Sequence, residues 1–528
     1  MLTFGGSKKA DLTEPMPTDT LITDLYAAFL LLFLPLVLHN GFFDVVETKY
    51  VFFLLFTAGY LLLLAVCAVL NRRTGRRGCA ARGTAAEYAA VLTVLLYAVS
   101  FFGAVIGGRV PFGEALVGRT NRMQGVLTAL LYAGVFVCVS RHTRLTGAIA
   151  AGAAVSALLT AALALMNDLT LDPLRLYHGM RPSDECRYIA SVGNVNFFGN
   201  LIGLMACLFV GGFLGAKKRT SRAVHTALLL LCGAAVVPSG SDALALQLTV
   251  PLLLCPLIVT DAKRLGRVPL AALVMLIGMG VPMLYRTFAD TRFFAPHFVR
   301  LLTRPAVFAP LCAVLLAPAH LVSRGTVRFS RRAYAAVLLA LVLLGVAALV
   351  LVNTVRKDVS FGALDRFVKL DGAWGSDRGA IYAHCLDAFS TFSPFEKLFG
   401  GGPGALLRYD AQNRVFRDAL LDAAHSEYLQ LLLTVGIVGL MCHVVFLGCV
   451  IGTGIRAVSK SRNPLLLGSL LGVIGSAASA FVGIAQPATT PIFYLLCALT
   501  CARYATNDET STESTSTIVS IDSVGMNS

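Results

Sequence analysis

Charged residues and the motifs of nucleotide or metal chemistry are scarce in this chain. Only 14% of its 528 residues are charged and 56% are hydrophobic, whereas about a quarter of a soluble domain is charged. The chain has no P-loop or dinucleotide-binding pattern, no CxxC pair and no Cys/His spacing typical of a metal site. These absences exclude an ordinary soluble domain and give no support to nucleotide-dependent or metal-dependent chemistry.

Long apolar runs account for most of the sequence. Runs of roughly 18 or more apolar residues mark membrane-spanning helices, so the sequence predicts an all-α polytopic membrane protein with about fourteen spans. The predicted spans lie near residues 25–39, 50–70, 86–107, 123–140, 145–166, 193–215, 223–238, 242–260, 268–285, 305–323, 333–354, 427–453, 464–484 and 488–504. No internal repeat is evident, and the first run is too long for a cleavable signal peptide.

Basic clusters between the spans predict their orientation. The formal charge of +15 would suggest nucleic acid in a soluble protein, but the positive-inside rule accounts for much of it, and no nucleic-acid partner is expected. The clusters lie in residues 72–82, 217–222, 263–267, 324–332 and 456–462. With the spans above, all of these loops fall on one side of a cytoplasmic (plasma) membrane, which places both termini in the cytoplasm.

This threading divides the chain into five parts. They are a cytoplasmic N-terminal tail (1–20), transmembrane helices (21–354), one large extracytoplasmic loop (355–424), C-terminal transmembrane helices (425–505) and a disordered, Ser/Thr-rich cytoplasmic tail (506–528). Most of the thirteen cysteines lie in apolar runs, where cysteine behaves as a small hydrophobe. Cys186 and Cys385 both fall in external segments and could pair, although two unpaired thiols are the favoured interpretation.

Arginines that the orientation rule does not require are numerous on the predicted outer face. They are Arg109, Arg119, Arg122, Arg175, Arg181, Arg187, Arg286, Arg292, Arg300, Arg304, Arg356, Arg366, Arg378, Arg408, Arg414 and Arg417. The planar guanidinium group suits bidentate phosphate contacts, so an anionic ligand is one interpretation of the set. The alternative is a solvated surface with salt bridges to residues such as Asp172, Asp184, Asp365 and Asp377.

Two further segments have the composition of a binding site. The run from Gly400 to Gly404 is flexible backbone that permits close approach to phosphate or sugar, although it could equally be a turn before an interfacial segment. Asn194, Asn196 and Asn200 form an amide-rich patch at the start of a predicted span. Amides hydrogen-bond sugars and phosphates, but they also cap helices.

His425 is the strongest single candidate for a catalytic residue. A neutral imidazole can take a proton from a hydroxyl group near physiological pH, and Glu427 and Tyr428 follow closely enough to orient it or to bind substrate. Titratable groups at the mouth of a membrane helix are costly and usually functional. The alternative is an interfacial polar residue; His178, His297 and His384 have no comparable neighbours in the sequence.

Several of these pieces resemble the O-antigen ligase and O-antigen polymerase family. The segment from His425 to Leu429 (HSEYL), with Gly436 and Gly439 after it, is similar to the family's His-Asn-x-Tyr-Leu…Gly-x-x-Gly signature. Asp377-Arg378-Gly379, followed by Phe389 and the tract Pro394 to Gly404, resembles its arginine, aromatic and glycine tract. Asn194-Val-Asn196 and Arg122 with Gly125 resemble the starts of two of its helices. The resemblance covers roughly residues 120–500.

Three positions depart from the family pattern. Asp242 follows Ser241 where the family often has Ser-Arg, Ser426 stands where asparagine is usual, and Gln486 stands where an acidic residue is common. The arginine absent at position 242 would be either missing or supplied from elsewhere in the chain.

The resemblance implies a GT-C-like glycosyltransferase that needs neither metal nor nucleotide cofactor. Its donor would be a glycan on a polyprenyl diphosphate such as undecaprenyl diphosphate, and its acceptor a glycan, lipid or protein hydroxyl on the outer face of the membrane. His425 would be the base and Arg378 the main diphosphate contact. The implied substrate-binding residues are Arg122, Asn194, Asn196, Gly402, Gly404, Glu427 and Tyr428.

Other classes of protein remain open at this stage. The resemblance does not distinguish a ligase from a polymerase. A non-enzymatic transporter or flippase of lipid-linked glycan would also have many helices and a basic external face, although the paired halves of many transporters are not evident. A catalytically inactive relative that serves as a scaffold is a third alternative, because of Asp242.

Overall fold

The structure is a computed structural model that describes residues 17–73, 83–119, 122–323, 329–355, 359–362, 365–416 and 420–504. Its regular elements are α1 (Thr18–Leu36), α2 (Val45–Arg73), α3 (Ala85–Ile106), α4 (Phe112–Val117), α5 (Val126–His142), α6 (Gly147–Asp168), α7 (Pro182–Glu185), β1 (Tyr188–Ile189), β2 (Gly193–Asn194), α8 (Val195–Gly215), α9 (Arg219–Val236), α10 (Ala243–Ile258), α11 (Ala262–Leu265), α12 (Val268–Tyr285), α13 (His297–Leu302), α14 (Pro305–Ser323), α15 (Arg331–Thr354), α16 (Asp365–Val368), α17 (Trp374–Ser390), α18 (Pro394–Phe399), α19 (Ala405–Gln412), α20 (Glu427–Lys460), α21 (Pro464–Ser479) and α22 (Thr490–Thr500). The predicted tail 506–528 lies outside the described residues, and α1 begins inside the predicted N-terminal tail.

The helices confirm an all-α polytopic membrane protein. Within the described residues, eight helices are long and apolar enough to cross a membrane, and α5, α10, α14, α21 and α22 are shorter apolar helices. Each predicted span overlaps one of the helices. The two strands are only a short antiparallel hairpin, in which Tyr188 pairs with Asn194.

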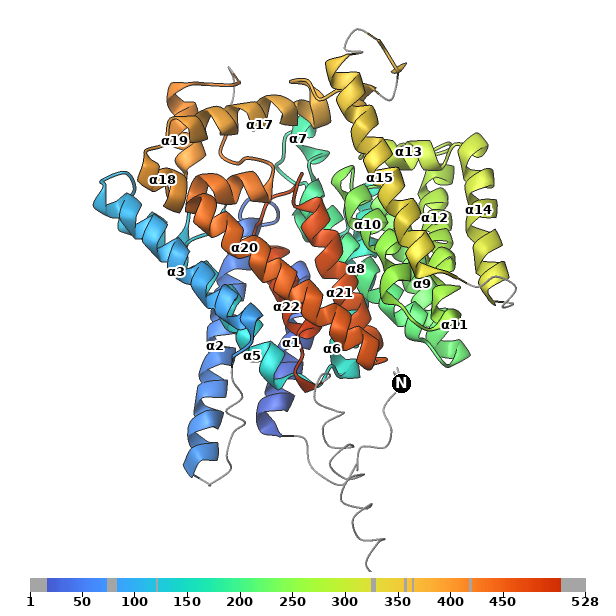
Figure 1. Ribbon diagram of the computed structural model, residues 1–528, viewed down its shortest axis with the longest axis horizontal. Coiled ribbons are helices and arrows are strands. Elements are labelled where there is room, and N and C mark those ends of the chain that lie inside the picture. The colour runs from blue at the N-terminus through green and yellow to red at the C-terminus, as the bar shows by residue number, and fades with distance from the viewer. Residues whose placement is uncertain are drawn as a thin grey trace, which may run out of the picture.

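Burial separates the helices into a central group and a lipid-facing group. Nearly all of α8 is buried, and it packs closely on α21, where a Cβ added to Gly211 would lie 2.3 Å from the backbone nitrogen of Gly468. Small residues allow such close contact between membrane helices. By contrast, every residue of the very apolar α15 is at least partly exposed, as expected for a helix that lipid surrounds. Figure 1 shows α15 crossing in front of the helices near α9 and α12.

Several basic loops lie together at one end of the helices. Arg264 donates to the carbonyl of Arg462 at 2.8 Å, Arg267 to that of Leu214 at 3.0 Å, and Arg331 to that of Val259 at 3.2 Å. The opposite end carries α17, α18 and α19, at the top of the view in Figure 1. The structure therefore separates basic loops from the segment that carries most of the candidate chemistry.

The cysteines Cys186 and Cys385 are both free thiols. Cys385 is buried within α17, and burial raises the pKa of its thiol to about 12. A reactive thiolate is therefore not expected at this position.

Candidate functional site

A cavity of about 760 Å³ collects most of the predicted site residues. Its walls come from α2, α3, α5, α8, α10, α17, α20, α21 and α22, together with residues 179–188. Six predicted residues line it, namely Arg122, Asn194, Asn196, Arg378, His425 and Glu427. Tyr428, Gly402 and Gly404 are not among the lining residues. Segments far apart in the sequence thus meet around one cavity that combines cationic, amide, carboxylate and imidazole groups.

His425 stands in a strained backbone conformation just before α20. Its φ of 49° is in the left-handed region, which L-residues adopt rarely and which often marks a functional site. Its carbonyl accepts a hydrogen bond from the hydroxyl of Tyr382 at 3.2 Å, and Ser426 caps α20 by accepting from the backbone N–H of Leu429. The turn therefore directs the half-buried imidazole into the cavity.

The surroundings of His425 favour its neutral form. Burial lowers the pKa of the imidazole, and the positive charges of Arg378 and Arg122 lower it further. The carboxylate of Asp422 opposes this shift but does not reverse it. A neutral imidazole at physiological pH is the protonation state that a general base requires.

Arg378 follows three consecutive residues with left-handed backbone. The φ values of Gly375, Ser376 and Asp377 are 61°, 61° and 66°, and the Arg378 guanidinium donates to the carbonyl of Gly375 at 2.5 Å. Among the residues that the structure describes, no carboxylate lies within ion-pair distance of Arg378, and its Nε atom is buried without a partner. The cavity thus contains a guanidinium charge that no carboxylate of the described residues neutralises, which favours an anionic ligand.

Arg122 is held by a carboxylate that the sequence did not single out. Its Nε and one terminal nitrogen donate to the two oxygens of Asp422 at 3.1 and 2.6 Å. This bidentate pair ties the loop before α5 to the segment that leads into His425. The only signal in the sequence that could have indicated a role for Asp422 was its position three residues before His425.

Glu427 and Tyr428 anchor the start of α20 to the α21–α22 connection. The Glu427 carboxylate accepts from the backbone N–H of Ala485 at 2.5 Å, and its own N–H donates to Ala480 at 2.8 Å. The hydroxyl of Tyr428 donates to the carbonyl of Ala477 at 2.7 Å. Glu427 both faces the cavity and fixes its wall, whereas Tyr428 has a structural contact here.

The amides at the start of α8 belong to a capped helix end. The Oδ1 atom of Asn194 accepts from the N–H of Asn196 at 2.9 Å. Asn194 therefore caps α8, which was the alternative role that the sequence analysis gave to these amides. Deeper in the protein, Asn200 donates to the hydroxyl of Thr489 at 3.0 Å and accepts from Gln247 at 2.8 Å. Asn200 and Gln247 also line the cavity, so this wall is rich in amide groups.

The glycine tract lies in a separate structure that we call the clamp, defined as Gly400–Gly404 packed on Leu433–Gly436. Gly401 donates to Leu433 at 2.9 Å and Gly402 to Thr434 at 3.2 Å. A Cβ added at Gly436, where φ is 74° and ψ −173°, would lie 2.3 Å from the carbonyl oxygen of Leu398. Gly400 and Gly436 therefore allow the close backbone contact between the end of α18 and the kink in α20, whereas a Cβ added at Gly402 would meet Ala104 of α3 at 2.5 Å.

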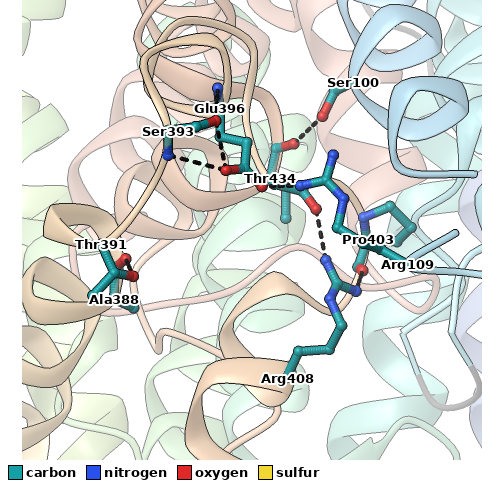
Figure 2. Close-up of polar contacts among 10 residues, drawn as sticks. Ser100, Arg109, Ala388, Thr391, Ser393, Glu396, Pro403, Arg408 and Thr434 are labelled. Carbon is teal, nitrogen blue, oxygen red and sulfur yellow. Dashed lines mark hydrogen bonds and ion pairs between the residues drawn. The ribbon is translucent and has the colours of Figure 1, made fainter. Parts of the chain in front are cut away.

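Charged side chains next to the clamp hold it in place, as Figure 2 shows. Arg408 donates to the carbonyls of Pro403 at 2.5 Å and Gly401 at 2.6 Å, and Arg109 forms an ion pair with Glu396. Ser100 donates to the carbonyl of Thr434. Burial lowers the pKa of Arg408, yet its carbonyl partners hold it in place.

Other arginines of the predicted outer face brace the fold. Arg286 pairs with the fully buried Asp168 at 2.7 Å. Arg292 pairs with Glu185 and lies 3.8 Å above the ring of Tyr177. For these residues the salt-bridge interpretation holds. Arg356 and Arg417 lie outside the described residues, as does the side chain of Arg366.

The three departures from the family pattern occupy structural positions. Asp242 contacts His297 at 2.8 Å and accepts from the N–H of Phe298 at 3.2 Å, and it does not line the cavity. Gln486 is fully buried, where its side chain bonds Thr489 at 2.7 Å. Together with the Ser426 cap, these contacts give each unusual residue a local role.

Two further histidines have environments that the sequence did not reveal. His443 is almost fully buried and lines the cavity within α20. His384 lies 3.0 Å from the fully buried Asp410, whose carboxylate also accepts from the N–H groups of Val415 at 3.1 Å and Leu421 at 2.8 Å. Asp410 thereby fixes the segment that leads to Asp422 and His425. Within the described residues, no three His, Cys, Asp or Glu side chains gather as metal ligands.

The fold and the cavity define a polytopic α-helical membrane protein with a basic, histidine-containing cavity at one end. Residues 302–444 match a protein-family model described as O-antigen ligase. The match supports assigning the chain to the O-antigen ligase and polymerase family, and with it an enzyme of membrane glycan assembly. The matched region includes Arg378, the clamp and His425. No curated protein matches the chain.

Proposed function

We propose that this protein transfers a glycan from a polyprenyl-diphosphate carrier to an acceptor hydroxyl at the outer face of the membrane. The observation that carries the proposal is that Arg378, which has no carboxylate partner among the described residues, lines the same cavity as His425, whose surroundings lower the pKa of its imidazole. The guanidinium of Arg378 suits a diphosphate, and the imidazole of His425 suits a hydroxyl group that must lose a proton. Together with the family match, this pairing favours glycosyl transfer over simple binding.

The reaction requires one bond to form and one to break. The acceptor oxygen attacks the anomeric carbon of the donor sugar, and its proton passes to the imidazole of His425. The bond between the anomeric carbon and the diphosphate breaks, and both electrons leave with the diphosphate. Arg378 and Arg122 stabilise the negative charge that develops on this leaving group, while Glu427, Asn194 and Asn196 contact the sugars. Tyr428, Gly402 and Gly404 act indirectly, by fixing α20.

The topology that this chemistry needs is also a proposal. About fourteen spans would place residues 355–424 outside the cell and both termini in the cytoplasm. Labelling single introduced cysteines on the outer surface, at exposed positions such as Ser360 and Lys460, tests the orientation. Labelling at Ser360 but not at Lys460 is expected, and the reverse pattern would overturn it.

Turnover tests the function directly. Purified protein is supplied with a lipid-diphosphate glycan and an acceptor, and the new glycosidic bond and free polyprenyl diphosphate are measured. We expect His425→Ala to lower turnover by about 10²- to 10⁴-fold, because a general base contributes that much. The exposed His178, which does not line the cavity, provides the control His178→Ala, which should retain turnover.

The same assay separates the alternatives. Near wild-type turnover in His425→Ala would refute the base assignment. Movement of unaltered lipid-linked glycan between leaflets, with no bond formed, would indicate a flippase. In cells that lack the gene, short chains would indicate a polymerase, whereas chains of normal length that remain on the carrier would indicate a ligase.

A further inference from the structure

The cavity has a second polar region that the proposed reaction leaves without a role. We call it the rim, defined as Phe43, Glu47, Arg181, Asp184 and Arg187, all of which line the cavity. The rim comes from the start of α2 and from the connection between α6 and α8, whereas Arg378 and His425 come from the segments around α17 and α20. It is therefore a separate wall of the same cavity.

The rim combines an exposed aromatic ring with planar polar groups. Phe43 is 63% exposed, although its neighbour Phe42 is 5% exposed and packs on Tyr177 and Tyr188. Asp184 bonds Arg181 at 3.0 Å through one oxygen and lies 3.5 Å from Arg187 through the other. An apolar face bordered by a few fixed hydrogen-bonding groups is the usual chemistry of a site for a small polar ring.

Stability alone does not explain these ion pairs. The side chains of Arg181 and Arg187 are 85% and 69% exposed, and pairs so exposed contribute little to folding. The side chain of Phe43 is likewise mostly exposed. The rim thus presents an aromatic ring and ion-paired groups at the cavity in exposed positions that folding does not require, so these groups are available to a ligand.

The backbone that presents the rim is nevertheless firmly braced. Tyr177 donates to the carbonyl of Tyr188 at 2.8 Å, and Asn167 accepts from the N–H of Ala190 at 3.0 Å. Ser191 donates to the carbonyl of Pro35 at 2.8 Å, where the fully buried Lys49 also donates at 2.9 Å. A rigid scaffold beneath exposed polar groups reduces the entropy lost on binding.

We propose that the rim is a subsite for a pyranose ring of the glycan. Phe43 packs against the C–H face of the sugar, and Arg181, Asp184 and Arg187 hydrogen-bond its hydroxyl or carboxyl groups. The ring bound here is held away from the reacting bond at His425. This inference rests on the proposed function for its choice of ligand, but it assigns the glycan to a wall that the reaction itself does not use.

A fluorescence experiment measures binding at the rim without turnover. The chain has a single tryptophan, Trp374, four residues before Arg378. In a Trp374→Phe background, Phe43→Trp places a reporter on the rim, and Phe288→Trp provides a matched control, since Phe288 is 86% exposed and does not line the cavity. The probes are the water-soluble glycan released by mild acid from the organism's own lipid-linked pool, and farnesyl diphosphate.

Saturable quenching of the Phe43→Trp variant by the released glycan, but not by farnesyl diphosphate, is the expected result. The Phe288→Trp variant should respond to neither probe. An unresponsive Phe43→Trp variant would overturn the inference, as would an equal response of the two reporters. A response to farnesyl diphosphate alone would mean that the rim binds the diphosphate of the donor, and this result would also overturn the inference.

Kinetics provide a second test. We expect Phe43→Ala and Arg187→Gln to raise the KM for the glycan substrate by roughly three- to tenfold with little change in kcat, whereas Arg175→Gln, an exposed residue outside the cavity, should change neither. A fall in kcat with an unchanged KM would contradict a binding role. If glycan quenches the Phe43→Trp variant while the wild-type protein shows no turnover, the proposed function fails and the glycan subsite stands.

Discussion

The clamp and the cavity treat their polar groups in opposite ways. Beside the clamp, Arg109 has a carboxylate and Arg408 has two carbonyl groups as partners. At the cavity, Arg378 has no carboxylate partner among the described residues, and His425 adopts a strained backbone. Satisfied groups stabilise a structure, whereas an available charge and a strained residue can serve a ligand. The difference teaches that arginine content alone does not locate the site.

The sharpest test of this comparison replaces one arginine at the cavity and one beside the clamp. Arg378→Gln should lower turnover by about 10²- to 10³-fold, because it removes a charge that stabilises the transition state, and should lower the melting temperature little, since only the carbonyl of Gly375 loses a donor. Arg408→Gln should lower the melting temperature, since it leaves carbonyl groups of the clamp without donors. Turnover and thermal unfolding in detergent measure the two effects, and interchanged phenotypes would show that the assignments are reversed.

The backbone of the clamp provides the next effect. Gly436→Ala should destabilise the protein by about 1–3 kcal/mol from its backbone conformation alone, with a further cost from the clash with Leu398. Turnover should fall with it, because α20 carries His425. The matched control is Gly448→Ala in the same helix, where an added Cβ meets nothing within 4 Å. Equal melting temperatures for the two variants would mean that the clamp does not need glycine.

The ion pair between Arg122 and Asp422 should shift the pH dependence in two directions. The base must be neutral, so turnover is lost as the pH falls through the pKa of His425. Arg122 lowers this pKa and Asp422 raises it. Arg122→Gln should therefore move the acid limb of the pH–kcat profile to higher pH, and Asp422→Asn should move it to lower pH. Parallel shifts in the two variants would exclude His425 as the titrating group.

The smallest effect is expected at Asp242. Its contact with His297 is partly exposed, and such pairs contribute about 0–1 kcal/mol. Asp242→Asn should therefore change both the melting temperature and the turnover little. A large loss of turnover in this variant would show that position 242 acts on the substrate despite lying outside the cavity lining.

Composition and periodicity alone determined the membrane class of this protein and the approximate places of its helices. A helix in lipid must be long and apolar, because its backbone can satisfy its hydrogen bonds only internally, and that requirement is local in sequence. The sequence also singled out His425, since a titratable group beside a long apolar run is costly, and the structure places this residue at the cavity. The resemblance then supplied Arg378 and a reaction.

Tertiary structure decided which polar residues share a cavity. The pairing of Arg122 with Asp422, the deep position of His443 and the rim around Phe43 depend on contacts between distant segments, which no local pattern specifies. For the same reason, the sequence left the tract from Gly400 to Gly404 open between a ligand contact and a turn, and the structure packs Gly400 on the kink at Gly436. Glycine permits close approach by any partner, and only the folded chain shows that here the partner is its own backbone.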